Sequence, residues 1–250
     1  MRLPAMAALG IAAYAVFLLA NTPATFIAAR ASAAAPGRIE LADPHGTWWS
    51  GSARARIRAT GGDVLLDRIE WRFLPARLAS GRIAFDVTAT GRGLDARSQV
   101  ARGFAGWELR DVAARGDAAA LTPLAPVIAT WRPEGKVAIS SPAIEWNDTR
   151  ARGDLRAEWS DAALSISDVR PLGSYRIDVH ADGGPASVAV ATISGPLRIA
   201  AQGTLMPPSA LRLSGDARGE GAAAAALEPL LNLIGPRRPD GARALEIRLN

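Results

Sequence analysis

The sequence contains no cysteine, only two histidines and, among its 29 basic residues, a single lysine, Lys136. The absence of cysteine excludes disulfide bonds, cysteine-ligated zinc and iron–sulfur sites, and thiol nucleophiles. Aromatic residues are also scarce, at 6% of 250 positions, although seven of them are tryptophans. Hydrophobic residues make up 49% of the chain, which is enough to bury the core of one domain or of two small ones.

Long runs of like charge are missing as well. The net charge is +5, but residues 1–33 contain Arg2 and Arg30 and no acid, which leaves 27 basic and 24 acidic residues in the remainder. In that remainder arginines alternate with aspartates and glutamates, and no run reaches five like charges. Nucleic-acid binding usually requires a basic stripe or patch. We therefore expect no nucleic-acid partner.

Motifs for catalysis and cofactor binding are absent. The chain has no Gly-x-Ser-x-Gly elbow, no His-Glu-x-x-His motif and no Walker loop, and the glycines at 91 and 93 lack the rest of a dinucleotide fingerprint. Asp43 and His45 could supply two metal ligands from a turn, but a loop role is the simpler interpretation. His180 falls on the polar face of a strand pattern. The sequence predicts no enzyme activity, no catalytic residues and no cofactor or metal site.

The N-terminal segment is apolar over an unusual length. No charged residue occurs from 3 to 29, and residues 3–20 are almost all hydrophobic. About 20 residues rising 1.5 Å each span a bilayer, whereas the apolar core of a signal peptide is about 7–15 residues long. We therefore predict a transmembrane anchor within residues 1–30 and a linker over 31–45. The small residues Ala31-Ser32-Ala33 leave a cleaved signal peptide as the alternative.

After residue 46 the dominant pattern is the period-two alternation of amphipathic strands. Ala53, Ala55 and Ile57, for example, alternate with arginines. The same pattern recurs around 69–73, 83–87, 155–159, 175–179, 197–199, 211–213 and 245–249. The pattern and the intervening turn signals predict about ten to twelve strands in a mainly β domain over residues 46–250.

Two later segments are helical in pattern and similar to each other. We predict short helices within 118–131, with Thr122 and Pro123 at a start position, and within 222–234, with Glu228 and Pro229 in the same role. Residues 119–135 align without a gap to 225–241, with nine of 17 positions identical. This similarity predicts a duplication, with halves of about 46–140 and 141–250, each containing one short helix.

So many amphipathic strands present more apolar surface than two short helices can cover. Two sheets packed face to face, a closed barrel and an open curved trough would all solve this problem. The duplication favours the trough, that is, one extended and curved antiparallel sheet formed by both halves.

The adjacent tryptophans Trp48 and Trp49 are the candidate partner-binding residues. Neighbouring residues in a strand point to opposite faces, so one of the two would remain available to a partner if both lay in a strand. The other five tryptophans are expected to pack in the core.

Several segments resemble the type II secretion system protein N family. After the apolar N-terminus these are 46–51 (GTWWSG), 66–75 (LDRIEWRFLP) with Leu78 and Gly81, 121–124 (LTPL), 133–135 (PEG), 172–175 (LGSY) and 230–235 (LLNLIG). None is a catalytic signature, so the resemblance is carried by their order and spacing along nearly the whole chain.

The resemblance implies an inner-membrane protein with one N-terminal span and a periplasmic β-rich domain. It implies a non-enzymatic role in the machinery that exports folded proteins across the Gram-negative outer membrane, with contacts to the secretin or the inner-membrane platform proteins. The residue patterns leave a second function open, because the apolar face of a β-trough could carry or shield a lipid or another hydrophobic ligand.

Overall fold

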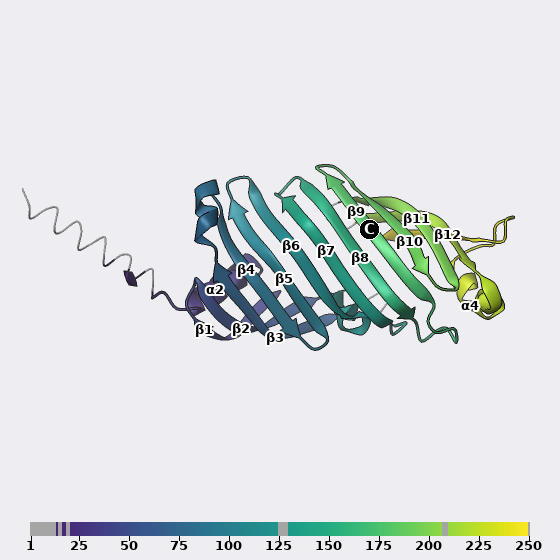
Figure 1. Ribbon diagram of the computed structural model, residues 1–250, viewed down its shortest axis with the longest axis horizontal. Coiled ribbons are helices and arrows are strands. Elements are labelled where there is room, and N and C mark those ends of the chain that lie inside the picture. The colour runs from purple at the N-terminus through teal and green to yellow at the C-terminus, as the bar shows by residue number, and fades with distance from the viewer. Residues whose placement is uncertain (1–13, 15–16, 19–20, 125–129, 207–209, 250) are drawn as a thin grey trace, which may run out of the picture.

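The computed structural model describes residues 14, 17–18, 21–124, 130–206 and 210–249, and it is mainly β (Figure 1). Each strand pairs antiparallel with the next one along the chain, in a single sheet of 13 strands. The strands are β1 (Ile39–Gly46), β2 (Ser50–Ala59), β3 (Gly62–Phe73), β4 (Ile83–Gly91), β5 (Leu94–Gly103), β6 (Gly106–Asp117), β7 (Glu134–Trp146), β8 (Ala151–Ala163), β9 (Gly173–Asp182), β10 (Ala186–Ser194), β11 (Leu197–Met206), β12 (Ala210–Gly219) and β13 (Arg243–Leu249). The helices are α2 (Thr25–Ala34) and α4 (Ala224–Ile234), with the short 3-10 helices η1 (Pro75–Ser80), η2 (Ala118–Leu124) and η3 (Gly221–Ala223).

The sheet is open. β1 and β13 are its two edges and do not pair with each other, so the barrel and the two-sheet sandwich are both ruled out for the described residues. Figure 1 shows β1 to β3 turning behind the middle strands, so the sheet is curved. The prediction of one extended antiparallel sheet is confirmed, with 13 strands in place of ten to twelve.

One face of the sheet is apolar from end to end. Residues directly opposite each other in a ladder project to the same side. The register places Ile57 opposite Val64, and Ile177 opposite Val190. The other face carries charged side chains that pair across strands. The period-two alternation of the sequence thus becomes a division between two faces.

Among the described residues α2 and α4 pack on the apolar face, and the short η2 also contacts β3, β6 and β7. At the N-terminal end, Ala24 and Ile27 pack with Ala53 of β2 and Trp71 of β3. At the C-terminal end, α4 buries three leucines against side chains of β8, β9, β11 and β12, and these leucines are Leu227, Leu230 and Leu231.

Between these two places lies a region that we call the central apolar face. It consists of Val100, Leu109, Ile139, Ile144, Leu155 and Ile177. None of these side chains belongs to a buried hydrophobic cluster of the described residues. Five of them are half-buried, and Ile177 is exposed, with 36% of its surface accessible. The middle of the sheet therefore keeps apolar surface accessible.

The N-terminal boundary of the sheet differs from the prediction. Residues 31–45, expected to be a linker, contain the end of α2 and nearly all of β1. The reason lies in the sequence, because Ile39 and Leu41 flank Glu40 in the same alternation and pair with Ile57 and Ala55 of β2.

The anchor is predicted within residues 1–30, and of its apolar stretch 3–20 only residues 14, 17 and 18 are described. Residues 25–30 belong to α2. Within the described part of the chain, no helix combines the length and the apolar character needed to cross a membrane. The transmembrane helix stays a prediction from the sequence.

The helical segments occupy equivalent places in the two halves. Six strands are followed by η2, and six more strands are followed by η3 and α4. α4 begins at Ala224, so the prediction of a start at Glu228 was wrong and Pro229 lies inside the helix. The repeat of element order places a boundary before β7, near residue 134, and the similarity of the two halves remains a prediction.

Replacing Leu227 by alanine tests the packing of α4. Leu227 is fully buried, so Leu227→Ala is expected to lower the free energy of unfolding by about 2–5 kcal/mol. Leu233 lies on the same helix with 73% of its surface exposed, and Leu233→Ala should change stability by no more than about 0.5 kcal/mol. Urea unfolding of both variants gives the comparison, and equal effects would contradict the packing described.

Candidate functional site

The segment 46–51, which we call the tryptophan turn, connects β1 and β2. Gly46 has φ +87°, and a Cβ there would lie 2.6 Å from the Ser50 carbonyl oxygen. A Cβ on Gly51 would lie 2.6 Å from Cζ2 of Trp71. Glycine is therefore required at both ends of the turn, at one for the backbone conformation and at the other for the close approach of a ring.

The turn holds Trp48 and Trp49 outside any strand. The indole N–H of Trp71 donates to the Thr47 carbonyl oxygen at 3.2 Å and to the Trp48 carbonyl oxygen at 3.1 Å. The rings of Trp48 and Trp49 stack on each other with centroids 6.1 Å apart, so they do not point to opposite faces. Trp48 is half-buried and also packs on Phe73, whereas Trp49 is 40% exposed. Partner binding by this pair stays a prediction.

The start of the continuously described chain is attached to the same turn. The backbone N–H of Trp48 donates to the Thr22 carbonyl oxygen at 3.0 Å, and the N–H of Ala24 donates to the Gly46 carbonyl oxygen at 3.0 Å. Residues 22–24 are thus fixed beside Trp48 and Trp49, and the apolar N-terminal segment precedes them in the chain.

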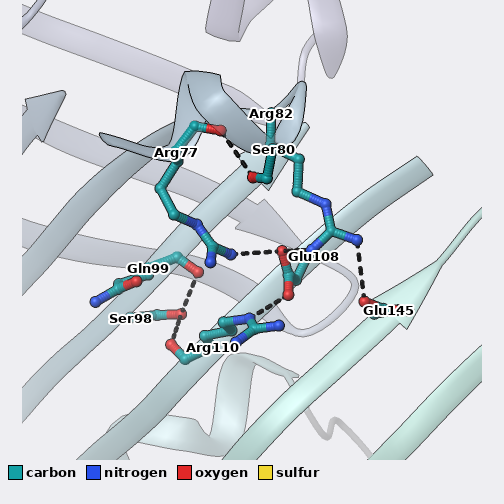
Figure 2. Close-up of polar contacts among 8 residues, drawn as sticks. All are labelled: Arg77, Ser80, Arg82, Ser98, Gln99, Glu108, Arg110 and Glu145. Atoms are coloured by element: carbon teal, nitrogen blue, oxygen red, sulfur yellow. Dashed lines mark hydrogen bonds and ion pairs between the residues drawn. The ribbon is translucent and has the colours of Figure 1, made fainter. Parts of the chain in front are cut away.

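A second cluster lies on the polar face under η1 (Figure 2). Glu108 of β6 is 3% exposed, and its carboxylate accepts hydrogen bonds from Arg77 at 2.8 Å, from Arg82 at 2.6 Å and from Arg110. Arg82 also donates to Glu145 of β7 at 3.3 Å. The cluster therefore ties η1 and the start of β4 to β6 and β7.

The cluster is structural in character. Burial raises the pKa of Glu108, but the hydrogen bond from Arg110 and the charges of Arg110, Arg82 and Arg77 together outweigh it and lower the pKa below its usual value. A carboxylate held ionised in this way is a poor proton donor near neutral pH. Arg77 and Arg82 lie 31 and 26 positions from Glu108, so no local sequence pattern pointed to the cluster.

The histidines form no catalytic group. His180 lies on the polar face as predicted, with Nδ1 2.7 Å from Oδ1 of Asp154, and this hydrogen bond and the charge of Asp154 raise the pKa of His180. The pair is well exposed and lines an open hollow of about 620 Å³ on that face. Asp43 is paired with Arg54, while His45 contacts only the Asp43 carbonyl oxygen through its ring. Among the described residues no group of three or more acids or histidines is placed to hold a metal ion.

The two edges of the sheet differ. β1 has an irregular register between Ala42 and His45 and contains Pro44, and α2 packs beside it. β13 is regular, and only its first residues are covered, because Arg243 bridges to Arg237. From Leu245 onward the outer side of β13 pairs with no other strand of the described chain. An unprotected edge of this kind can accept a further strand.

The profile of the family "Type II secretion system (T2SS), protein N" matches residues 37–246. The chain belongs to the type II secretion system protein N family. The match extends from just before β1 into β13 and so includes nearly the whole sheet. Searches of curated proteins and of solved structures found no match.

Membership in the protein N family confirms the resemblance seen in the sequence and makes the chain a component of the type II secretion system. That machinery belongs to the cell envelope, and protein N is an accessory component of it and not a known enzyme family. The pair Trp48 and Trp49 was singled out from the sequence, whereas the turn that holds it, the Glu108 cluster and the free β13 edge required the structure.

Substitution of Glu108 tests the second cluster. Glu108→Gln removes the charge shared by three arginines and should lower the free energy of unfolding by about 1–3 kcal/mol at pH 7. Because the pKa of Glu108 is lowered on folding, this contribution is complete above the usual glutamate value and is lost as pH falls below about 4. The difference between wild type and variant should therefore shrink in acid.

The matched control is Glu145→Gln, since the Glu145 carboxylate is 51% exposed and, among the described residues, forms an ion pair with Arg82 alone. This change should lower stability by less than about 1 kcal/mol. Urea unfolding between pH 3 and pH 7 measures both variants. A pH-independent effect of Glu108→Gln would mean that its charge is not what stabilises the cluster.

Proposed function

We propose that this protein N is a non-enzymatic scaffold of the type II secretion system. In this proposal residues 3–20 anchor it in the inner membrane, and the sheet lies in the periplasm and contacts the secretin or the inner-membrane platform proteins. The single observation that carries the proposal is the regular, uncovered edge of β13 in a chain of this family.

The physical argument concerns unpaired backbone groups. A free edge presents a row of N–H and C=O groups, and an extended segment of another protein can pair with them as an added strand. Leu245 and Ile247 would give such a strand apolar contacts on one face, and Glu246 and Arg248 would give it polar contacts on the other. β1 is a poorer acceptor because its register is irregular and Pro44 lacks an N–H.

A second function is favoured by the central apolar face. Its half-buried side chains form an apolar surface that no buried cluster of the described residues includes. A surface of this kind could shield the acyl chain of a lipid in the periplasm. In that case the ligand would contact Ile177 and Leu155, and the β13 edge would have no necessary role.

Photo-crosslinking in cells separates the two functions. A photoreactive amino acid at Ile247 of β13 should crosslink to secretin or platform proteins, whereas the same probe at Ala42 of β1 should not. A probe at Ile177 reports on the second function through lipid adducts. If Ile247 gives no protein adduct in cells that secrete normally, the scaffold proposal through β13 is wrong.

A charged residue at the edge provides the functional test. Ile247→Lys places a charge where an added strand would pack, and charges on edge strands oppose strand addition. We expect exoproteins to accumulate inside the cells while the amount of protein N stays unchanged. Ile193→Lys on β10 is the control, because Ile193 has a similar exposure (45% against 37%) and lies away from the edge. Normal secretion with Ile247→Lys would contradict the proposal.

A further inference from the structure

Aromatic side chains gather at one end of the sheet. In an antiparallel meander the connections alternate between two ends, and the tryptophan turn, η1 and the β5–β6 hairpin lie at the same end. We call this end the aromatic rim and define it by Trp48, Trp49, Phe73, Phe85, Phe104, Trp107 and Trp146.

The aromatic rim contains groups of packed rings that come from distant parts of the sequence. Trp48 packs on Phe73 at 5.1 Å and on Phe85 at 6.3 Å, measured between ring centroids. Trp107 stacks on Trp146 at 6.3 Å. Phe104 lines one hollow with Trp107 and Trp146, and a Cβ on Gly81 at the end of η1 would lie 4.0 Å from its ring. The rim therefore extends from β1 to β7.

The rim exposes apolar surface to the surroundings. Phe104 at the tip of the β5–β6 hairpin is fully exposed, Leu78 is 51% exposed and Ile83 is 53% exposed. Apolar surface is unfavourable in water by about 25 cal/mol per Å². Exposed groups that lie together on one end of a molecule are typical of a surface that contacts a partner or a membrane.

The position of the N-terminal segment identifies the membrane as the partner. Residues 22–24 are hydrogen-bonded to the tryptophan turn, and in the sequence they closely follow the apolar segment 3–20. The residues that come after the apolar segment are therefore held at this rim. The opposite end also exposes Trp131 and Leu233, but it has neither this attachment nor the same clustering of aromatic rings. Both ends of the sheet thus expose apolar side chains. The rim differs because residues 22–24 are hydrogen-bonded to it.

The charges at the rim fit a lipid surface. The guanidinium of Arg102 lies over the Trp107 ring at 4.9 Å from its centroid. Neither Arg102 nor Arg150, which lines the hollow beside Phe104, takes part in an ion pair among the described residues. Arginines beside tryptophans are typical of the headgroup region, where the ring is amphipathic and the cation meets lipid phosphates.

We propose that the aromatic rim lies in the headgroup region of the bilayer that holds residues 3–20, with Phe104 and Leu78 in contact with lipid. The inference rests on the anchoring in the proposed function. It adds that this end of the sheet contacts the membrane. The contact is a second attachment, weaker than the anchor. The orientation of the sheet relative to the membrane is thereby fixed.

Depth-dependent quenching tests the contact, and the absence of native cysteine makes single labelling simple. The full chain is reconstituted into vesicles of zwitterionic and anionic phospholipid, with an environment-sensitive fluorophore at Leu78→Cys, at Ile193→Cys on the opposite end, or at Asn21→Cys beside the anchor. Leu78 and Ile193 have similar exposure, 51% and 45%. Brominated lipids should quench most of the emission at 21 and 78 and leave position 193 unchanged.

The outcomes distinguish the rim from the anchor. Adding Phe104→Ser should reduce the quenching at position 78 and leave that at 21 unchanged. Quenching at 21 alone overturns the rim proposal and leaves the anchor intact. If neither position is quenched, both anchoring and the rim contact are wrong. Equal quenching at 78 and 193 would show that the fluorophore itself partitions into lipid. If a benzophenone at position 78 captures only protein in cells, the rim contacts a protein partner. Either result overturns the proposal.

Discussion

The structure depends on one constraint, which is that thirteen amphipathic strands lie in a single open sheet with one apolar face. Among the described residues α2 and α4 pack on this face, and these two places hold two of the four buried hydrophobic clusters. On the central apolar face the side chains are only partly removed from water. The interior of the molecule is therefore small for its length, and surfaces that a sandwich or a barrel would have buried remain available for contacts.

The uncovered surfaces of the sheet differ in chemistry and regularity, so a different role is expected for each. The polar face carries cross-strand ion pairs such as Arg156 with Asp178 and is adapted to water. The β1 edge is irregular, whereas the β13 edge is regular and open. The aromatic rim includes the tryptophan turn, to which residues 22–24 are hydrogen-bonded. In the scaffold role proposed above, such separate surfaces would contact different partners.

Much of the architecture was predictable because the two faces of an amphipathic strand correspond to alternating apolar and polar residues in the sequence. Ile177 and Val179, for example, flank Asp178, and this pattern alone places them on one side. At Ile39 and Leu41 the same alternation includes only two apolar residues before Pro44. The sequence therefore predicts a linker where the structure has β1. Glu108 could not be interpreted from its neighbours, since the arginines that surround it are brought there by η1. The sequence left open whether Trp48 and Trp49 both lie in a strand, and in the structure Gly46 and Gly51 make a turn of that segment.

The openness of the sheet is the central claim, and the distance between its two edges tests it most directly. Spin labels at Ala42→Cys in β1 and Glu246→Cys in β13, in a chain without other cysteines, report that distance by electron paramagnetic resonance. Paired strands lie about 5 Å apart, and Ser214→Cys with Glu246→Cys on the paired strands β12 and β13 gives the short-distance reference. We predict a distance well beyond this reference. Strong dipolar broadening equal to that of the reference pair would mean that β1 and β13 meet, and the sheet would then be closed.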